Sequence, residues 1–226
     1  MNILYIETSS KNCSVTIAND DEILCVCEEV SENYKQSESL HNFVEWALEG
    51  AELKINDIHA VCLGKGPGSY TGLRIGAAAA KGFCYGLKVP LIAINSMESM
   101  VQPLLGQGYD LIVPLLDARR MEVYTATFDG TTGEELKSTE ALILDENAFK
   151  SLEGKSVVFV GDGALKSKEI IQISSAEFIE DVYPSSKYLV EKGRVAAKEQ
   201  KFEDVAYFEP YYLKDFHGVK KKKSEE

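Results

Sequence analysis

A glycine-rich turn is the part of this sequence whose residue types could hold a phosphate. Gly64, Gly66 and Gly68 follow an apolar stretch, and the string GPGSYTGLRIG at 66–76 leads into a helix-like segment. Glycine turns that open a helix can bind phosphate through backbone N–H groups. A Walker A loop needs Gly-Lys-Ser/Thr at the start of the helix, whereas Lys65 precedes this turn. A dinucleotide fingerprint needs a different glycine spacing and an acidic residue about 20 positions further on, which is absent. The turn alone therefore assigns no nucleotide site.

The side chains that could act as nucleophiles, bases or metal ligands are scattered. No two histidines have the close helical spacing that lets two imidazoles share a metal ion; they are His41, His59 and His217. Serines in the predicted turns are better explained as turn or helix-capping residues; they are Ser9, Ser10 and Ser69. The residues therefore predict no catalytic group, no metal site and no cofactor.

Hydrophobic periodicity places these residues on a repeated α/β plan. An apolar strand, a polar turn and two further strands occupy 3–28, and the same order returns from 111. Each group is followed by a helix-like stretch and a strand ending in glycine, at 58–64 and at 157–161. Helices are predicted at 37–51, 70–87, 98–105, 146–152, 164–171 and 187–198. The pattern predicts an α/β architecture of two similar halves, 1–105 and 106–206, followed by a C-terminal segment, 207–226.

The predicted helix at 70–87 contains an unusual number of glycines. Gly72 and Gly76, and likewise Gly82 and Gly86, are four residues apart, so each pair lies roughly in line. Glycine costs a helix interior about 1 kcal/mol relative to alanine, so close approach of a neighbour must compensate. The pattern alone favours a neighbour within the same chain, and a second subunit is the alternative.

Composition sets limits on class and compartment. The chain has 226 residues, 45% of them hydrophobic, which suffices for a real core. Five cysteines form no CxxC pair, and the sequence opens directly on a strand, so we expect a cytoplasmic protein without a membrane span. The formal charge of −12 opposes independent binding to RNA. Only the basic run of Lys220, Lys221, Lys222 and Lys223 could act as an RNA-binding arm, although such a run is more often a solvated end.

Four segments, in order along the chain, resemble the TsaB family of bacterial tRNA threonylcarbamoyladenosine biosynthesis proteins. They are ILYIETS at 3–9, GPGSYTGLRIG at 66–76, LLDARRMEVYTATFD at 115–129 and EPYYLK at 209–214. The resemblance implies the duplicated actin-like fold of sugar kinases, Hsp70 and actin (the ASKHA fold), with two similar mixed-sheet halves. It also implies heterodimerisation with TsaD, which forms the threonylcarbamoyl group on adenosine 37 (t6A37) of tRNAs reading ANN codons, and recruitment of the ATPase TsaE. The tRNA would be reached only through that complex, in which this chain is a non-catalytic subunit.

The chain departs from the pattern of a working enzyme of that fold. Such an enzyme positions metal and water with an acidic residue in its first hairpin turn and needs glycines where the turns approach phosphates. Here Glu7 stands where the family usually has aspartate, no glycine follows it, and the second turn places Arg119 and Arg120 after Asp117. Three acidic residues are therefore at most vestiges of a nucleotide site: Glu7, Asp117 and Asp162, the last in the turn 161–164. An actin-fold ATPase or kinase with its own nucleotide site remains the alternative.

The resemblance also implies a helical seam as the surface that meets TsaD. We expect the helices at 37–51 and 70–87 to lie side by side and present small and apolar side chains to the partner. The same flank would pair two copies of the chain when TsaD is absent. The candidate contacts are Leu40, Phe43, Val44, Ala47, Tyr70, Gly72, Arg74, Ile75, Gly76, Ala79, Ala80 and Phe83. On this basis Gly76→Leu would leave the chain folded and abolish pairing.

Overall fold

The structure is a computed structural model that describes residues 1–32 and 36–214. The lysine run at 220–223 and His217 lie outside the described residues. The first sheet of the protein has the strand order β3-β2-β1-β4-β5. In it, β2 is antiparallel to β1, and β4 and β5 run parallel to β1. The strands are β1 (Ile3–Glu7), β2 (Asn12–Ala18), β3 (Ile23–Val30), β4 (Ala60–Gly64) and β5 (Leu91–Ile94).

The second sheet repeats the order and the strand directions of the first. It runs β10-β9-β6-β7-β8, with β7 antiparallel to β6 and with β9 parallel to it. Its strands are β6 (Leu111–Asp117), β7 (Glu122–Asp129), β8 (Glu135–Ile143), β9 (Val157–Val160) and β10 (Ala176–Ile179). Two five-stranded mixed sheets of one topology confirm the predicted α/β fold of two similar halves.

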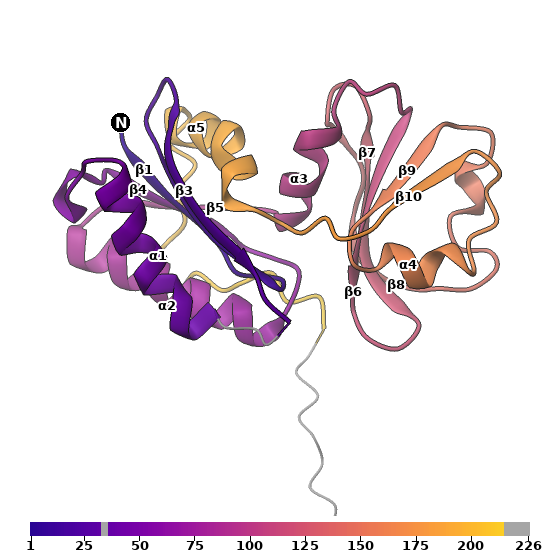
Figure 1. Ribbon diagram of the computed structural model, residues 1–226, viewed down its shortest axis with the longest axis horizontal. Coiled ribbons are helices and arrows are strands. Elements are labelled where there is room, and N and C mark those ends of the chain that lie inside the picture. Colours follow the sequence, from indigo (N-terminus) through magenta and orange to yellow (C-terminus); the bar gives the residue numbers. More distant parts are fainter. Residues whose placement is uncertain (33–35, 215–226) are drawn as a thin grey trace, which may run out of the picture.

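Helices cover both faces of the first sheet (Figure 1). The helices α1 (Gln36–Gly50) and α2 (Tyr70–Leu87) lie side by side on one face, and α5 (Val190–Lys198) lies on the other. Every residue of β1, β2 and β4 is buried, as expected for strands enclosed by two layers of helices. The α2 helix occupies the predicted range, and the Ser69 hydroxyl caps its first turn by accepting the Gly72 N–H at 3.3 Å.

Two short helical regions pack against the half of the molecule opposite to the one predicted from the boundaries 1–105 and 106–206. The helix α3 (Ser96–Val101) and the turn η2 (Gln102–Leu104) pack into the core of the second half, where Met97 and Met100 contact residues around Ile112 and Phe128. The turn η4 (Ser186–Leu189) and α5 return to the first half, where they pack on β1 and β5. The chain therefore crosses between the sheets after β5 and again after β10.

The remaining helical segments are shorter than predicted. The segment at 146–152 holds only the turn η3 (Lys150–Leu152), α4 spans Ala164–Lys168, and a further turn, η1, spans Ile55–Asp57. Within residues 1–32 and 36–214, no helix combines the length and the apolar character needed to cross a bilayer.

Candidate functional site

The first hairpin turn encloses its acidic residue. Glu7 is fully buried at the end of β1, where its Oε2 accepts the Ser96 hydroxyl and its Oε1 accepts the Ser9 N–H, both at 2.7 Å. A Cβ on Gly64 would lie 1.9 Å from Oε2, so the neighbouring strand leaves no space beside the carboxylate. Burial raises the pKa of Glu7, and the hydrogen bonds from Ser96 and Ser9 oppose that rise. The Glu7 carboxylate thus forms its hydrogen bonds with protein atoms, whereas the corresponding acidic residue of an enzyme would bind water.

The glycines of the 66–76 motif accommodate that same turn. A Cβ on Gly68 would lie 2.2 Å from the Ser9 carbonyl oxygen, and one on Gly72 would lie 2.1 Å from the Thr8 carbonyl oxygen. The Ser9 carbonyl accepts the Ser69 N–H at 2.6 Å, and the Thr8 hydroxyl donates to the Gly72 carbonyl at 2.8 Å. The motif therefore lets the start of α2 approach the β1–β2 turn, which fills the space that a phosphate would need.

The second hairpin turn is held by its own ion pair. Lys166 on α4 bonds Asp117 Oδ1 at 2.5 Å and also donates to the carbonyls of Arg120 and Glu122. Arg119 and Arg120 both have positive φ, of 68° and 52°, which is a rare conformation for side chains of that size. The turn thus exposes Arg119 and Arg120, and its acidic residue, Asp117, is paired with Lys166 of the same half.

The structure places the turn 161–164, which contains Asp162, against β6. A Cβ on Gly161 would lie 2.4 Å from the Leu115 carbonyl oxygen, and one on Gly163 would lie 3.0 Å from the same atom. Asp162 accepts the Asp117 N–H at 2.8 Å. Burial, and after it the nearby Asp117 carboxylate, raises the pKa of Asp162, while the Asp117 N–H and Lys166 oppose the rise. Asp117 and Asp162 therefore lie together, whereas Glu7 is enclosed in the first turn by Ser9 and Ser96.

Metal-binding residues do not gather in the part of the chain that the structure describes, where no group of three or more His, Cys, Asp and Glu side chains could hold an ion. His59 accepts the Asn2 N–H through Nδ1, and His41 lies exposed on α1 with its ring 5.9 Å from that of Phe83.

The predicted docking residues divide between two opposite faces. Seven of the twelve are buried within the first half: Leu40, Phe43, Val44, Ala47, Gly72, Gly76 and Ala80. A Cβ on Gly76 would lie 2.3 Å from Thr8 Oγ1 and 3.2 Å from Leu63 Cδ1, so Gly76→Leu would disturb the fold before any partner was involved. The structure corrects the placement of these seven, because the apolar stripe read from the sequence faces the chain's own sheet. The other five keep partial or full exposure: Tyr70, Arg74, Ile75, Ala79 and Phe83.

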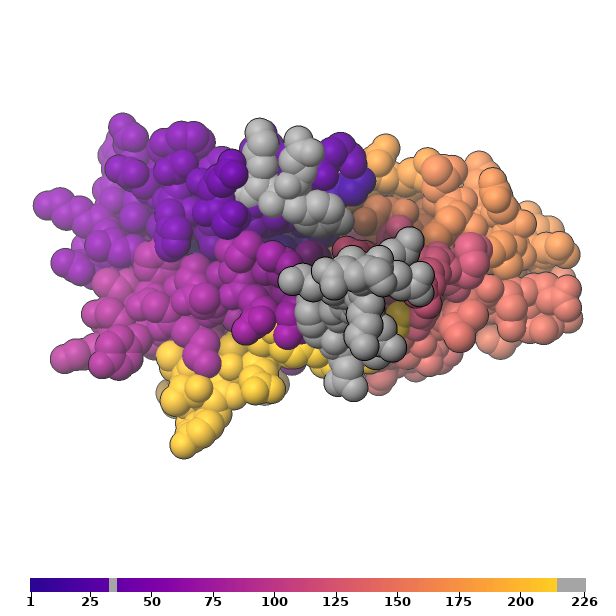
Figure 2. Space-filling view, turned by 90° about the horizontal axis from the view of Figure 1, so that it is seen from below, coloured from indigo at the N-terminus to yellow at the C-terminus, as the bar shows by residue number. Residues whose placement is uncertain are grey.

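A different set of side chains lines the solvent side of the helix pair, onto which Figure 2 looks. We call it the outer face; it comprises Ile75, Ala78, Ala79, Gly82, Phe83, Tyr85 and Gly86 of α2, while Trp46 is exposed separately on α1. Trp46 is 53% exposed and Tyr85 is 85% exposed. A Cβ at Gly82 or Gly86 would meet no atom within 4 Å. The four-residue spacing of these two glycines was visible in the sequence, whereas the exposure of Tyr85 and Trp46 was not.

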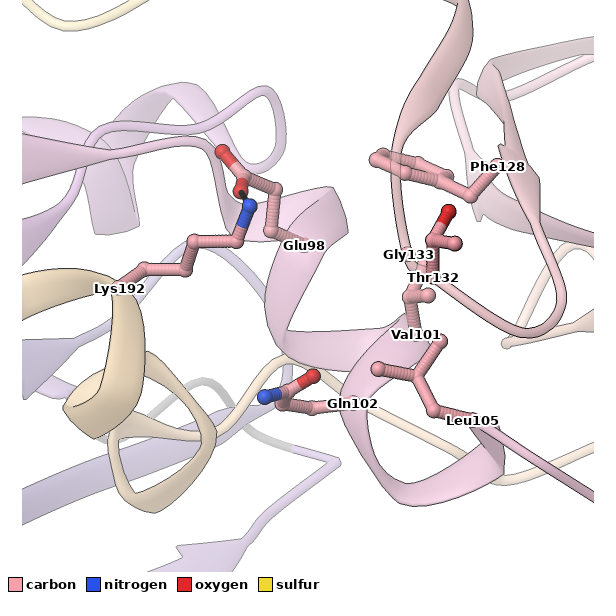
Figure 3. Close-up of a pocket in the computed structure, with 8 residues that line it drawn as sticks. All are labelled: Glu98, Val101, Gln102, Leu105, Phe128, Thr132, Gly133 and Lys192. Atoms are coloured by element: carbon pink, nitrogen blue, oxygen red, sulfur yellow. Dashed lines mark ion pairs between the residues drawn. The ribbon is translucent and has the colours of Figure 1, made fainter. Parts of the chain in front are cut away.

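Two cavities lie where the halves meet. The smaller, of about 110 Å³, is lined from α3, α5 and the β7–β8 turn, and an ion pair of 3.1 Å joins Glu98 to Lys192 across one side of it (Figure 3). The larger, of about 360 Å³, is lined by Asn12, Glu28 and Val30 of the first half, by Pro103 and Leu104, and by residues of the return crossing at 181–188. Both cavities depend on the relative position of the two sheets.

Comparison with known proteins agrees with the sequence motifs. The family model described as TsaD, tRNA N6-adenosine threonylcarbamoyltransferase, matches residues 26–219. The tRNA threonylcarbamoyladenosine biosynthesis protein TsaB of Escherichia coli is 28% identical over 98% of this chain and 98% of its own. The protein of the same name from Bacillus subtilis is 28% identical over 76% of each chain.

Solved structures show the same fold. YeaZ from Pseudomonas aeruginosa superimposes with a TM-score of 0.82 at 23% identity, covering 94% of this chain and 99% of that one. A second Pseudomonas aeruginosa structure, described as similar to peptidase YEAZ, has a TM-score of 0.84 at 22% identity and the same coverage of both chains. The family model covers most of the chain, and the TsaB proteins named above align with most of it. The chain therefore belongs to the TsaB family, within the broader family of the threonylcarbamoyltransferase TsaD.

Proposed function

We propose that this chain acts in tRNA threonylcarbamoyladenosine biosynthesis as a docking subunit without chemistry of its own. It would pair with TsaD, the subunit that modifies adenosine 37 of tRNAs reading ANN codons, and the pair would recruit TsaE in the cytoplasm. The names of the E. coli and B. subtilis relatives support the pathway. The enclosed Glu7 and the ion-paired second turn support a role without catalysis, because both use their polar groups to hold the fold.

The outer face is the surface that we assign to TsaD. The observation that carries this assignment is the pair Gly82 and Gly86, which lie within an 18-residue helix and have open space where a side chain would be. Glycine destabilises a helix interior, and packing inside this chain gives these two positions no compensation. A helix from another subunit would provide it, since small side chains let two backbones approach closely.

The neighbours of these glycines favour the same use. Exposed aromatic side chains are frequent anchors in protein interfaces, and Tyr85 lies beside Gly82 and Gly86 on the exposed side of α2. The His41–Phe83 contact joins α1 to α2 at the edge of this face. In the absence of TsaD, we expect the outer face to pair two copies of the chain.

The first test is Gly82→Leu. We expect the isolated variant to melt at or above the wild-type temperature, because its Cβ meets no atom, and to bind TsaD at least tenfold more weakly in co-elution and calorimetry. Glu191→Leu, on the exposed side of α5, is the control for adding one leucine to an exposed helix position; it also removes the 2.9 Å ion pair with Arg194, which lies away from the outer face, and should bind as wild type does.

The same variants then enter a modification assay containing TsaD, TsaE, tRNA and threonylcarbamoyl adenylate. Omitting the chain or supplying Gly82→Leu should stop modification, whereas Glu191→Leu should sustain it. A folded Gly82→Leu chain with wild-type affinity for TsaD would remove the outer face from the proposal. Modified tRNA formed without the chain would reject the docking role itself.

A further inference from the structure

The motif EPYYLK at 209–214 lies where the C-terminal part of the chain passes from one half to the other. Before it, Glu203 forms a bridge with Leu91 at the edge of β5, and Phe208 is buried in the core beside α2. Lys81 of α2 donates to the carbonyls of Ala206 and Phe208 at 3.0 and 3.1 Å. Figure 2 shows this segment along the side of the first half. The C-terminal segment is thus fixed to the first half up to residue 208.

The next four residues hold the first half through two further contacts. The Tyr211 N–H donates to the Lys65 carbonyl at 2.8 Å, in the turn after β4. The Tyr212 ring lies 5.0 Å from that of Tyr70, the first residue of α2, and the Arg74 guanidinium lies 5.5 Å from the same Tyr70 ring. These contacts involve the backbone of Tyr211 and the side chain of Tyr212.

The same residues also reach the second half. The Tyr211 hydroxyl donates to the Thr139 carbonyl of β8 at 3.3 Å. Lys214 forms an ion pair with Glu122 of β7, and its ammonium lies 5.7 Å from the Tyr124 ring. Side chains of one short segment therefore contact β7 and β8 while its backbone remains attached to the first half.

We propose that residues 209–214 form a latch that fixes the opening between the two halves. Two lobes joined by chain crossings move relative to each other unless further contacts hold them. The crossings after β5 and after β10 lie at the joint itself, together with the Glu98–Lys192 ion pair and both cavities. The latch adds a third connection, from the end of β4 to the start of β7 and the middle of β8. Releasing it would let the halves open and would change the shape of the 360 Å³ cavity.

The test separates the two ends of the latch. Tyr211→Phe with Lys214→Ala removes only the contacts to β7 and β8 and keeps the Tyr211 N–H on Lys65. Tyr212→Ala removes the ring that packs against Tyr70 and keeps the contacts to the second half. The matched control is Tyr207→Phe with Lys137→Ala, which loses an exposed tyrosine hydroxyl and an ion pair confined to β8.

The measurement is time-resolved energy transfer from Trp46, the only tryptophan of the chain, to an acceptor introduced as a noncanonical residue at the exposed position of Leu165 in the second half. We expect both latch variants to give a broader and longer distance distribution than wild type, and the control to match wild type. Latch variants that match the control would overturn the proposal. A change confined to Tyr212→Ala would also overturn it, since that would indicate a local effect on α2 alone.

Discussion

Glu7 shows how one residue can keep the chemical type of a catalytic group and lose its setting. Its carboxylate bonds Ser96, at the start of α3, and thereby ties the first hairpin turn to the joint between the halves. Ser96 in turn accepts the Gly66 N–H at 3.1 Å, so the glycine motif is part of the same network. The residue that would order metal and water in an enzyme of this fold orders the protein backbone here.

The enclosure of Glu7 makes a prediction about pH. Burial raises the pKa of Glu7 in the folded state from its ordinary value of 4.5. At a pH above 4.5, Glu7 therefore binds a proton more readily in the folded chain than in the unfolded chain. The contribution of Glu7 to the free energy of unfolding should therefore fall as pH rises from about 4.5 toward neutrality. Glu7→Gln removes that dependence, so the stability of the variant relative to wild type should rise with pH. Urea unfolding at several pH values measures it.

Glu45→Gln, on the exposed side of α1, is the control for losing one negative charge from a chain of net charge −12. A stability difference between Glu7→Gln and wild type that stays constant from pH 4.5 to pH 7 would contradict the burial effect.

At the scale of elements, α2 has two faces with different uses of glycine. On its inner face, Gly72 and Gly76 let the helix approach Thr8 within van der Waals contact. On its outer face, a Cβ added at Gly82 or Gly86 would meet no atom within 4 Å among residues 1–32 and 36–214. The inner pair serves the fold, and the outer pair is available for a partner.

This division predicts opposite results for one substitution at two positions. Gly82→Ala should stabilise the isolated chain by about 1 kcal/mol, since alanine is the better helix former and has room there. Gly76→Ala should destabilise it, because the new methyl group would overlap Thr8 Oγ1. Thermal and urea unfolding of the two variants measure the difference, and a destabilised Gly82→Ala would contradict the assignment of its face as open.

The same helix shows what sequence patterns can and cannot predict. Periodicity and the serine cap defined α2 at both ends, and they identified the apolar stripe of α1. They did not determine what that stripe faces, since a core and an interface select the same residue types. The strands β5 and β10 have only four residues each, too few to give a period. The packing of α5 on the first sheet is a long-range contact, and the local sequence carries no signal for it.

At the scale of the whole molecule, the net charge of −12 separates this chain from proteins that bind RNA by themselves. We expect the purified chain to produce no salt-sensitive shift of tRNA in a gel, at any concentration at which it pairs with TsaD. Replacing Lys220, Lys221, Lys222 and Lys223 by alanine should change nothing. A shift that disappears both with added salt and with those replacements would instead assign the lysines as an RNA-binding arm.

The filled first turn also bears on how readily such a chain could acquire a phosphate site in evolution. Shortening Glu7 to aspartate would withdraw the carboxylate from Ser96 and leave a small void, because Thr8 and Ser9 already occupy the space beside Gly68 and Gly72. Room for a phosphate would require the turn, the glycine motif and the start of α3 to change together. If the chain acts as the proposed docking subunit, no single substitution in this turn would then give it a phosphate site.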